Sequence, residues 1–174
     1  MKFKIFLYYP GPKSSIFTLW KEGADTPEIE NALLEYKEIQ GERAYQELTG
    51  SLRKSCEKFG FDPYGYKSEG PTGREAVYAF KQTGRFRFYF YYDARERILL
   101  SGGGLKTTRS YQEDPKLYFM VRCLIGLEKL IKNNDDLSLI KLHKIEISIE
   151  FNETGDIINQ KEILEKINNE NQSE

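Results

Sequence analysis

The sequence predicts an α+β fold, in which a small antiparallel sheet packs against an N-terminal helical pair and a later helix, with an appended C-terminal hairpin. Two observations carry this prediction. Short runs rich in Phe, Tyr and Ile alternate with blocks of helical periodicity. Of the 174 residues, 39% are hydrophobic and 14% aromatic, which is enough to bury one core. A wholly disordered chain is therefore excluded.

The first elements are two strands. Residues 2–9 (KFKIFLYY) have strand composition and stop at Pro10-Gly11-Pro12. Residues 15–20 (SIFTLW) form either a second short strand or a helical turn. Thr26 then has the character of a helix N-cap, with Pro27 at the first helical position.

Two helices should follow, separated near Gly41. Each has one stripe of residues at helical spacing. The first stripe is Ile29, Leu33, Tyr36 and Gln40, and the second is Tyr45, Leu48, Leu52, Cys56 and Phe59. Cys56 is thus a small core residue rather than a nucleophile.

The central segment predicts a loop, three strands and a helix. Residues 60–73 are rich in Gly and Pro and form a long loop. Strands are expected at 75–82, 85–92 and 97–101, with short turns at 83–84 and 93–96. Asp114-Pro115 opens a helix, with Cys123 beside its buried stripe of Leu117, Met120, Val121, Leu124, Leu127 and Ile131.

The C-terminal segment predicts a strand, a turn and a second strand. Residues 144–151 (KIEISIEF) alternate Ile or Phe with Glu or Ser, and 152–155 (NETG) form a turn. Residues 161–167 add a short helix. We therefore divide the chain into a domain at 1–132 and an acidic extension at 133–174.

The charge is unevenly distributed along the chain, although the net charge is only −1. Residues 74–122 contain ten basic and five acidic residues, whereas 133–174 contain four basic and ten acidic ones. This pattern indicates either a surface that faces a polyanion or two unrelated solvated faces.

The sharpest local pattern is the run at 85–92, RFRFYFYY. Side chains alternate between the faces of a strand, so Phe86, Phe88 and Phe90 should lie in the core. The other face then carries Arg85, Arg87, Tyr89 and Tyr91. Arginine binds phosphate and aromatic rings stack on unpaired bases, so this face suits RNA. The alternative is a solvated face on which Arg stacks on Tyr.

A glycine run follows the last of these strands. Gly102, Gly103 and Gly104 predict a connection that bends or approaches a ligand closely, from which Lys106 and Arg109 could reach a phosphate. The spacing of a P-loop is absent. The alternative is a flexible connection between strand and helix. His143, the only histidine, has no Cys or His at metal-ligand spacing and is expected at the surface.

The order of strand, two helices, three antiparallel strands and helix resembles the RelE/ParE-type toxin superfamily. Residues 77–132 carry the resemblance, which is strongest to the HigB-like branch. In that branch a strand with Arg and aromatics leads through a hairpin to a hydrophobic strand, a glycine and a segment rich in Lys and Thr. Here these parts are 85–92, 98–100, Gly102–Gly104 and 106–108.

Members of the superfamily cleave mRNA on the ribosome or, in the ParE branch, act on gyrase, and an antitoxin protein typically neutralises them. For this chain the resemblance implies a metal-independent mRNA endoribonuclease toxin, and the sequence leaves dependence on the ribosome open. By position, Arg85 or Arg87 resembles the strand arginine of the family, Lys106 its lysine after the hydrophobic strand, and Tyr111 its base-stacking aromatic residue. Together with the Arg/Tyr face and the segment after the glycines, this leads us to expect catalytic roles for Arg85, Arg87, Lys106 and Arg109, and RNA binding by Tyr89, Tyr91 and Tyr111. HigB-like members often have a His where this chain has Gly102. A non-catalytic module that contacts nucleic acid or an acidic protein is therefore the alternative. A third reading is a protein whose acidic C-terminal region engages another chain.

Several classes are not expected. No apolar run is long enough for a transmembrane helix, and the first residues lack the cleavage site of a signal peptide. Two distant cysteines support neither a zinc site nor a disulfide scaffold. We expect a cytoplasmic protein with no membrane association, no metal and no cofactor.

Overall fold

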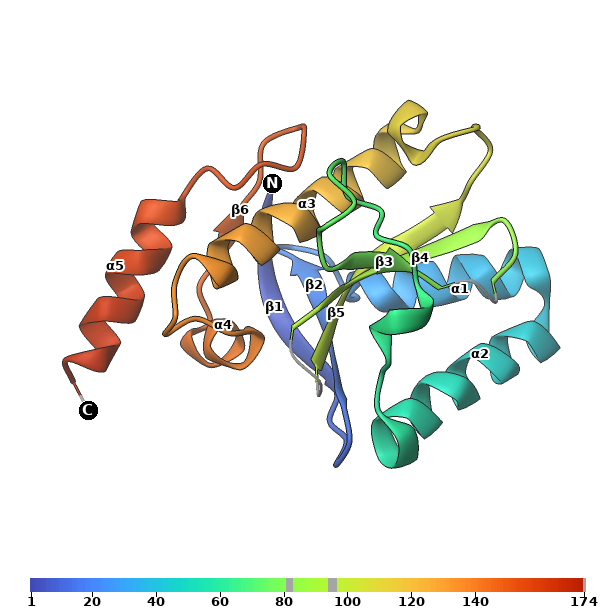
Figure 1. Cartoon of the computed structure of the whole chain (residues 1–174), viewed down its shortest axis with the longest axis horizontal. Helices are drawn as coiled ribbons and strands as arrows, with labels where there is room; N and C mark the ends of the chain where they lie inside the picture. The colour runs from blue at the N-terminus through green and yellow to red at the C-terminus, as the bar shows by residue number, and fades with distance from the viewer. Residues whose placement is uncertain (81–82, 94–96, 174) are drawn as a thin grey trace.

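The computed structural model describes residues 1–80, 83–93 and 97–173. They form a six-stranded sheet in the order β3-β4-β5-β2-β1-β6 (Figure 1). Neighbouring strands are antiparallel except β2 and β5, which are parallel. The strands are β1 (Lys2–Tyr9), β2 (Ser15–Lys21), β3 (Val77–Ala79), β4 (Phe86–Tyr92), β5 (Arg97–Leu105) and β6 (Ile149–Glu150).

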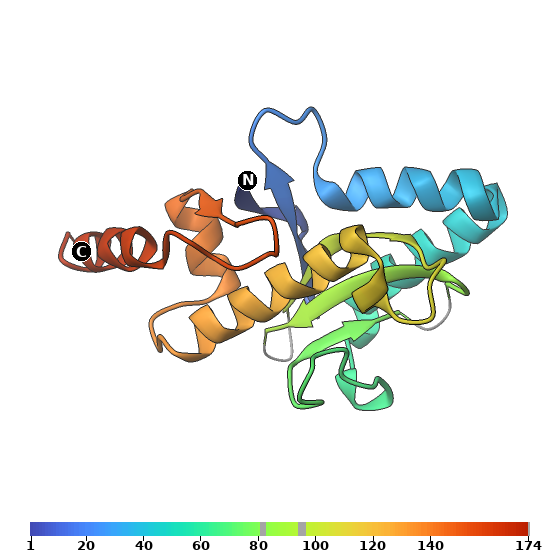
Figure 2. The same cartoon turned by 90° about the horizontal axis from the view of Figure 1, so that it is seen from above.

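Helices cover both faces of the sheet (Figures 1 and 2), so the predicted α+β class is confirmed. One core lies between the sheet and α1 and α2, and contains Ile29, Leu48, Phe88 and Leu100. The other lies beneath α3 and α4. The helices are α1 (Glu28–Gln40), α2 (Glu42–Lys54), α3 (Pro115–Lys132), α4 (Leu139–Ile145) and α5 (Gln160–Asn171).

The helix boundaries agree with most of the sequence signals. Gly41 separates α1 from α2 with φ of 91°, a conformation that glycine adopts without strain. Thr26 is not the N-cap of α1: Pro27 holds that position, and the Thr26 hydroxyl donates to Asn31 Oδ1 at 2.6 Å. Asp114 caps α3 as predicted, because its carboxylate accepts a hydrogen bond from the Leu117 amide at 3.0 Å.

The second helical stripe ends earlier than its spacing predicts. Leu48, Leu52 and Cys56 are buried, but Phe59 is 79% exposed. The chain winds into a π-helical turn at Ser55–Phe59, and this wider turn takes Phe59 off the apolar stripe. The loop at 60–73 follows as predicted, with one 3₁₀ turn at Pro63–Gly65.

Strand β5 extends beyond its predicted end at residue 101, to Leu105. The predicted connection at Gly102–Gly104 is therefore wrong, because these glycines are part of the sheet. A bulge between Phe88 and Phe90 places two residues of β5 opposite the single residue Tyr89, so β5 carries one extra residue there. Residues 81–82 of the predicted strand at 75–82, and 94–96 of the predicted turn, lie outside the described residues.

The C-terminal segment departs furthest from its predicted form. Residues 144 and 145 end helix α4, and Glu146 turns the chain with φ of 50°. Only two residues then form β6, which pairs with β1. The predicted hairpin is reduced to one antiparallel bridge between Phe151 and Ile157. The predicted short helix is the longer α5.

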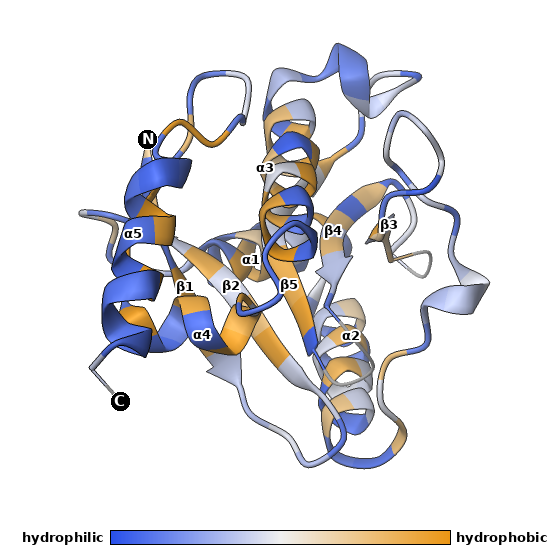
Figure 3. Ribbon diagram, turned by 60° about the vertical axis from the view of Figure 1, so that its left-hand side comes forward, coloured by the Kyte–Doolittle hydropathy of each residue, from blue (hydrophilic) through white to orange (hydrophobic). Residues whose placement is uncertain are grey.

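The described residues of the extension, 133–173, are packed into the main fold rather than held apart from it. Leu139, Ile149, Phe151 and Ile163 are fully buried in the core beneath α3. The outer side of α5 is hydrophilic, whereas β5 beneath α3 is hydrophobic (Figure 3). None of the helices within the described residues has the length and apolar character needed to cross a membrane.

Candidate nucleic-acid interface

The topology brings basic residues together at one end of the sheet. Strand β4 begins where β5 ends, because the two strands are antiparallel. The Lys106 amide donates to the Arg85 carbonyl at 2.9 Å, and Arg87 pairs with Gly104. We call Arg85, Arg87 and Lys106 the strand-end cluster. Arg109 is exposed in the connection to α3, and no described hydrogen bond joins it to the other three.

The three side chains of the strand-end cluster are held differently. The Arg87 guanidinium donates to the carbonyl of Gly84, in the turn before β4, and is half-buried. Arg85 is exposed and Lys106 is half-buried. Within the described part of the chain no carboxylate forms an ion pair with Arg85 or with Lys106. These two cations are therefore available to an anion from solution.

The predicted Arg/Tyr face is not an open face. Phe86, Phe88 and Phe90 are buried as predicted. However, Tyr89 is 1% exposed and Tyr91 is 2% exposed. Both pack in the core beneath α3, and burial raises the pKa of each phenol. The prediction that these tyrosines are accessible to bases is wrong, because α3 covers their side of the sheet.

Tyr111 connects the strand-end cluster to the long loop. Its hydroxyl donates to the Glu69 carbonyl at 2.7 Å, and its ring lies edge-on to Tyr89 with centroids 5.9 Å apart. Only 9% of the residue is exposed, and burial raises its pKa. In this position Tyr111 fixes the loop against the sheet and offers little ring surface to a base.

The glycines of β5 allow close packing within the protein. A Cβ atom on Gly103 would lie 2.6 Å from the Arg87 carbonyl oxygen and 2.8 Å from the Phe86 ring. On Gly104 it would lie 3.1 Å from Leu117 and 3.4 Å from Lys116 Nζ. Glycine is thus required so that β4 and α3 can approach β5, and not for a phosphate-binding loop.

The structure adds a carboxylate that sequence reasoning missed. Glu28, the first residue of α1, is half-buried, and its Cβ lies 3.6 Å from the place of a Cβ on Gly102. Burial raises the pKa of Glu28, and the positive charges of Lys21 and Lys116 partly oppose this effect. No local signal could identify Glu28, since α1 and β5 are far apart in the sequence.

Lys116 extends the basic surface from β5 toward α1. Its ammonium group lies 2.8 Å from Glu35 Oε2 on α1 and beside Gly104. The surface at this end of the sheet therefore alternates cations and carboxylates, and is positive mainly at Arg85 and Lys106.

The two cysteines and the single histidine are buried or half-buried within the fold. Cys56 and Cys123 are fully buried as predicted, and burial raises the pKa of the Cys56 thiol to about 11. His143 is half-buried, with Nδ1 3.1 Å from the Ile5 carbonyl oxygen. The described residues contain no group of three or more His, Cys, Asp or Glu side chains that could hold a metal ion.

No family model, no curated protein and no solved structure matches this chain.

Proposed function

We propose that this chain is a toxin-type endoribonuclease that binds single-stranded RNA at the strand-end cluster. The observation that carries the proposal is the adjacency of Arg85 and Lys106, joined by a backbone hydrogen bond of 2.9 Å and both without an acidic partner in the described residues. The element order supports it further: after the additional strand β1, the order β2-α1-α2-β3-β4-β5-α3 agrees with that of the RelE/ParE-type toxins.

The reaction proposed is attack of a ribose 2′-hydroxyl oxygen on the adjacent phosphorus. The 2′-oxygen–phosphorus bond forms, and the bond from phosphorus to the 5′-oxygen of the next nucleotide breaks. Arg85, Arg87 and Lys106 stabilise the additional negative charge on the phosphoryl oxygens. Arginine stays protonated, so it stabilises charge but does not accept the 2′ proton.

A carboxylate is the best candidate for the proton acceptor. Glu28 lies beside Gly102, the position at which HigB-like toxins often have a His. Burial raises its pKa, and a carboxyl group with a raised pKa is a better base near neutral pH. The leaving 5′-oxygen takes a proton from water, so the products would be a 2′,3′-cyclic phosphate and a 5′-hydroxyl end.

A non-catalytic binding module is the second candidate. The burial of Tyr89, Tyr91 and Tyr111 favours it, because the rings expected to position bases lie inside the protein. The strand-end cluster would then bind nucleic acid, or an acidic segment of a protein such as an antitoxin, by charge alone.

Expression in a bacterial host separates the two candidates. The wild type should arrest growth and cleave mRNA, and purified protein should cut single-stranded RNA in the presence or absence of ribosomes. Lys106→Ala and Arg85→Ala should each relieve the arrest and lower cleavage by about a hundredfold, as for removal of one transition-state donor. Lys161→Ala is the control, because Lys161 lies on α5 with its side chain 91% exposed.

The contrary result is equally clear. Growth without arrest, with RNA left intact under both conditions, excludes the endoribonuclease. Salt-sensitive RNA binding without cleavage then establishes the binding module.

A further inference from the structure

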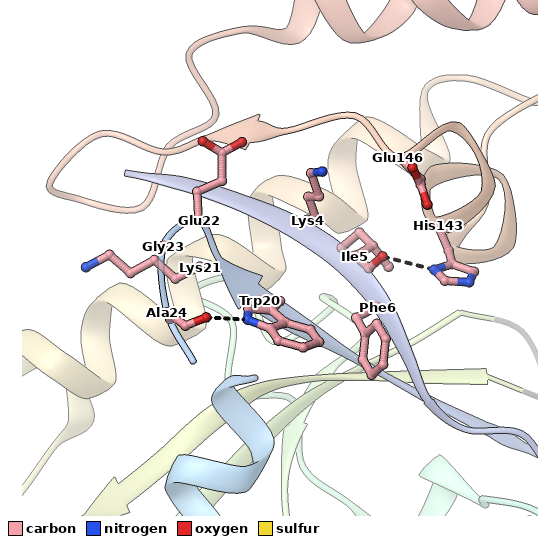
Figure 4. A pocket seen from close by; sticks show the side chains of 10 residues that line it. All are labelled: Lys4, Ile5, Phe6, Trp20, Lys21, Glu22, Gly23, Ala24, His143 and Glu146. Atoms are coloured by element: carbon pink, nitrogen blue, oxygen red, sulfur yellow. Dashed lines mark hydrogen bonds between the residues drawn. The ribbon is translucent and has the colours of Figure 1, made fainter. Parts of the chain in front are cut away.

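A pocket of about 370 Å³ lies between the first half of β1, the end of β2 and α4 (Figure 4). Aromatic, basic and acidic side chains line it, among them Lys4, Phe6, Trp20, Lys21, Glu22 and His143. This volume lies within the range of small-ligand sites. The proposed reaction uses none of these residues.

Two aromatic rings form an apolar wall of the pocket. Trp20 and Phe6 are half-buried, and their rings meet edge to face with centroids 4.9 Å apart. The indole Nε1 donates to the Ala24 carbonyl at 2.9 Å, which fixes the ring (Figure 4). Neither residue belongs to the two buried cores. Both rings therefore line the pocket rather than fill a core.

The polar groups of the pocket are arranged around this wall. A carbonyl oxygen only accepts, so His143 Nδ1 donates to the Ile5 carbonyl. Lys4 and Lys21 are exposed. The Glu22 carboxylate accepts a hydrogen bond from the Ser148 hydroxyl, and Glu146 also lines the pocket. Lys4 and Lys21 balance the charge of these two carboxylates, and a neutral, flat ring fits the aromatic wall.

The pocket is linked to the strand-end cluster through charged residues. Lys21 at its rim and Lys116 beside Gly104 both act on the Glu28 carboxyl group. Cations and carboxylates thus alternate from the pocket, across the start of α1 and α3, to Lys116 beside Gly104.

We propose that the pocket formed by Phe6, Trp20 and His143 binds an unpaired base of the RNA strand, with Lys4 and Lys21 contacting the flanking phosphates. This inference rests on the proposed function, and it assigns base stacking to Trp20 rather than to Tyr89 and Tyr91. Stacking on an aromatic ring accepts every base, so the site selects single strands and not a sequence.

Trp20 is the only tryptophan of the chain, so its fluorescence reports on this pocket alone. Titration with a single-stranded oligonucleotide of adenosines and uridines should quench the emission. Trp20→Leu should weaken binding of the oligonucleotide about tenfold, while Trp20→Phe retains most of the affinity. Lys21→Gln should reduce the slope of log affinity against log salt concentration by about one. Tyr64→Leu is the control, because Tyr64 is 95% exposed in the long loop.

Each outcome decides the proposal. RNA that binds without changing the emission, with equal affinity for Trp20→Leu, overturns it and leaves the proposed function intact. Quenching by the oligonucleotide without cleavage supports the pocket and removes the endoribonuclease. Quenching by AMP or UMP but not by the strand overturns the assignment to RNA, as does quenching only by an acidic peptide. Circular dichroism shows whether Trp20→Leu is folded. If it is not, the double variant Lys4→Gln, Lys21→Gln takes its place, and unchanged RNA affinity in that variant overturns the proposal.

Discussion

The amide of Lys106 donates to the carbonyl of Arg85 at 2.9 Å, so the residue after β5 and the residue before β4 lie side by side. This single backbone contact places two cations next to each other at the end of the sheet. Twenty residues separate them along the chain, and the β4–β5 hairpin brings them together.

RNA affinity should depend steeply on salt, because each phosphate contact releases condensed counterions. Replacing Arg85 or Lys106 by Gln should reduce the slope of log affinity against log salt by about one for each residue. Fluorescence anisotropy with labelled RNA between low and high salt measures this slope. A slope that does not change in either variant would remove the strand-end cluster from the interface.

The buried tyrosines should matter for stability and not for binding. Tyr89→Ala should lower the free energy of unfolding by about 3–5 kcal/mol, the usual cost of deleting a large buried ring. Tyr89→Phe keeps the ring in place and should leave RNA affinity unchanged. Urea unfolding and anisotropy test both statements. A loss of affinity in well-folded Tyr89→Phe would show that the phenol contacts RNA after all.

Gly103→Ala should destabilise the sheet, because the added Cβ would lie 2.6 Å from the Arg87 carbonyl oxygen. We expect a loss of about 1–3 kcal/mol, as for other overpacked sites. Gly50→Ala is the matched control: it lies inside α2, and an added Cβ has no neighbour within 4 Å. That variant should gain roughly 0.5–1 kcal/mol from helix propensity. Equal effects of both changes would contradict the packing argument.

Removing the charge of Glu28 and removing that of Asp156 should change the free energy of unfolding at pH 7 in opposite directions. Burial raises the pKa of Glu28 in the folded state, so its ionisation costs stability as pH rises through that value. Glu28→Gln should therefore stabilise the protein at pH 7 and have little effect below about pH 4.

Asp156 shows the reverse dependence. A hydrogen bond from the Thr154 hydroxyl, and then one from Arg122, lower the pKa of Asp156, so its stabilisation is present at neutral pH and lost on acidification. Asp156→Asn should destabilise the protein at pH 7, with the difference disappearing as pH falls below about 4. Urea unfolding at pH 7 and pH 3 measures both variants. A destabilised Glu28→Gln at pH 7 would show that its carboxylate has a stabilising partner.

Local patterns predicted the central elements well. The alternation at 85–92 placed Phe86, Phe88 and Phe90 in the core, and Asp114-Pro115 marked the start of α3. Composition also identified the long loop at 60–73 and the break at Gly41. These features depend on side chains within a few residues of each other, and such information is present in one sequence.

The candidate site was predicted less completely. Arg85, Arg87 and Lys106 were identified by residue type, and the structure brings them together. Glu28 was missed because it approaches Gly102 only after α1 packs on β5. The pocket at Trp20 was missed for the same reason, since β1, β2 and α4 form it jointly.

The sequence by itself determined helix α3, strand β4 and the face of β4 that carries phenylalanine. It placed the neighbouring strands less well: among the described residues of the segment predicted at 75–82 only Val77–Ala79 is strand, and the glycines predicted as a connection are part of β5. Only the tertiary structure decided that the opposite face is also buried, because α3 covers Tyr89 and Tyr91. It also decided which secondary structure residues 144–151 adopt, although their alternation of apolar and polar side chains suits a strand. Ile145 ends α4 and Ile149 pairs with β1, yet both are buried in the same core. Burial of apolar side chains is non-directional, so an apolar alternation can be satisfied by either secondary structure, and long-range packing selects between them.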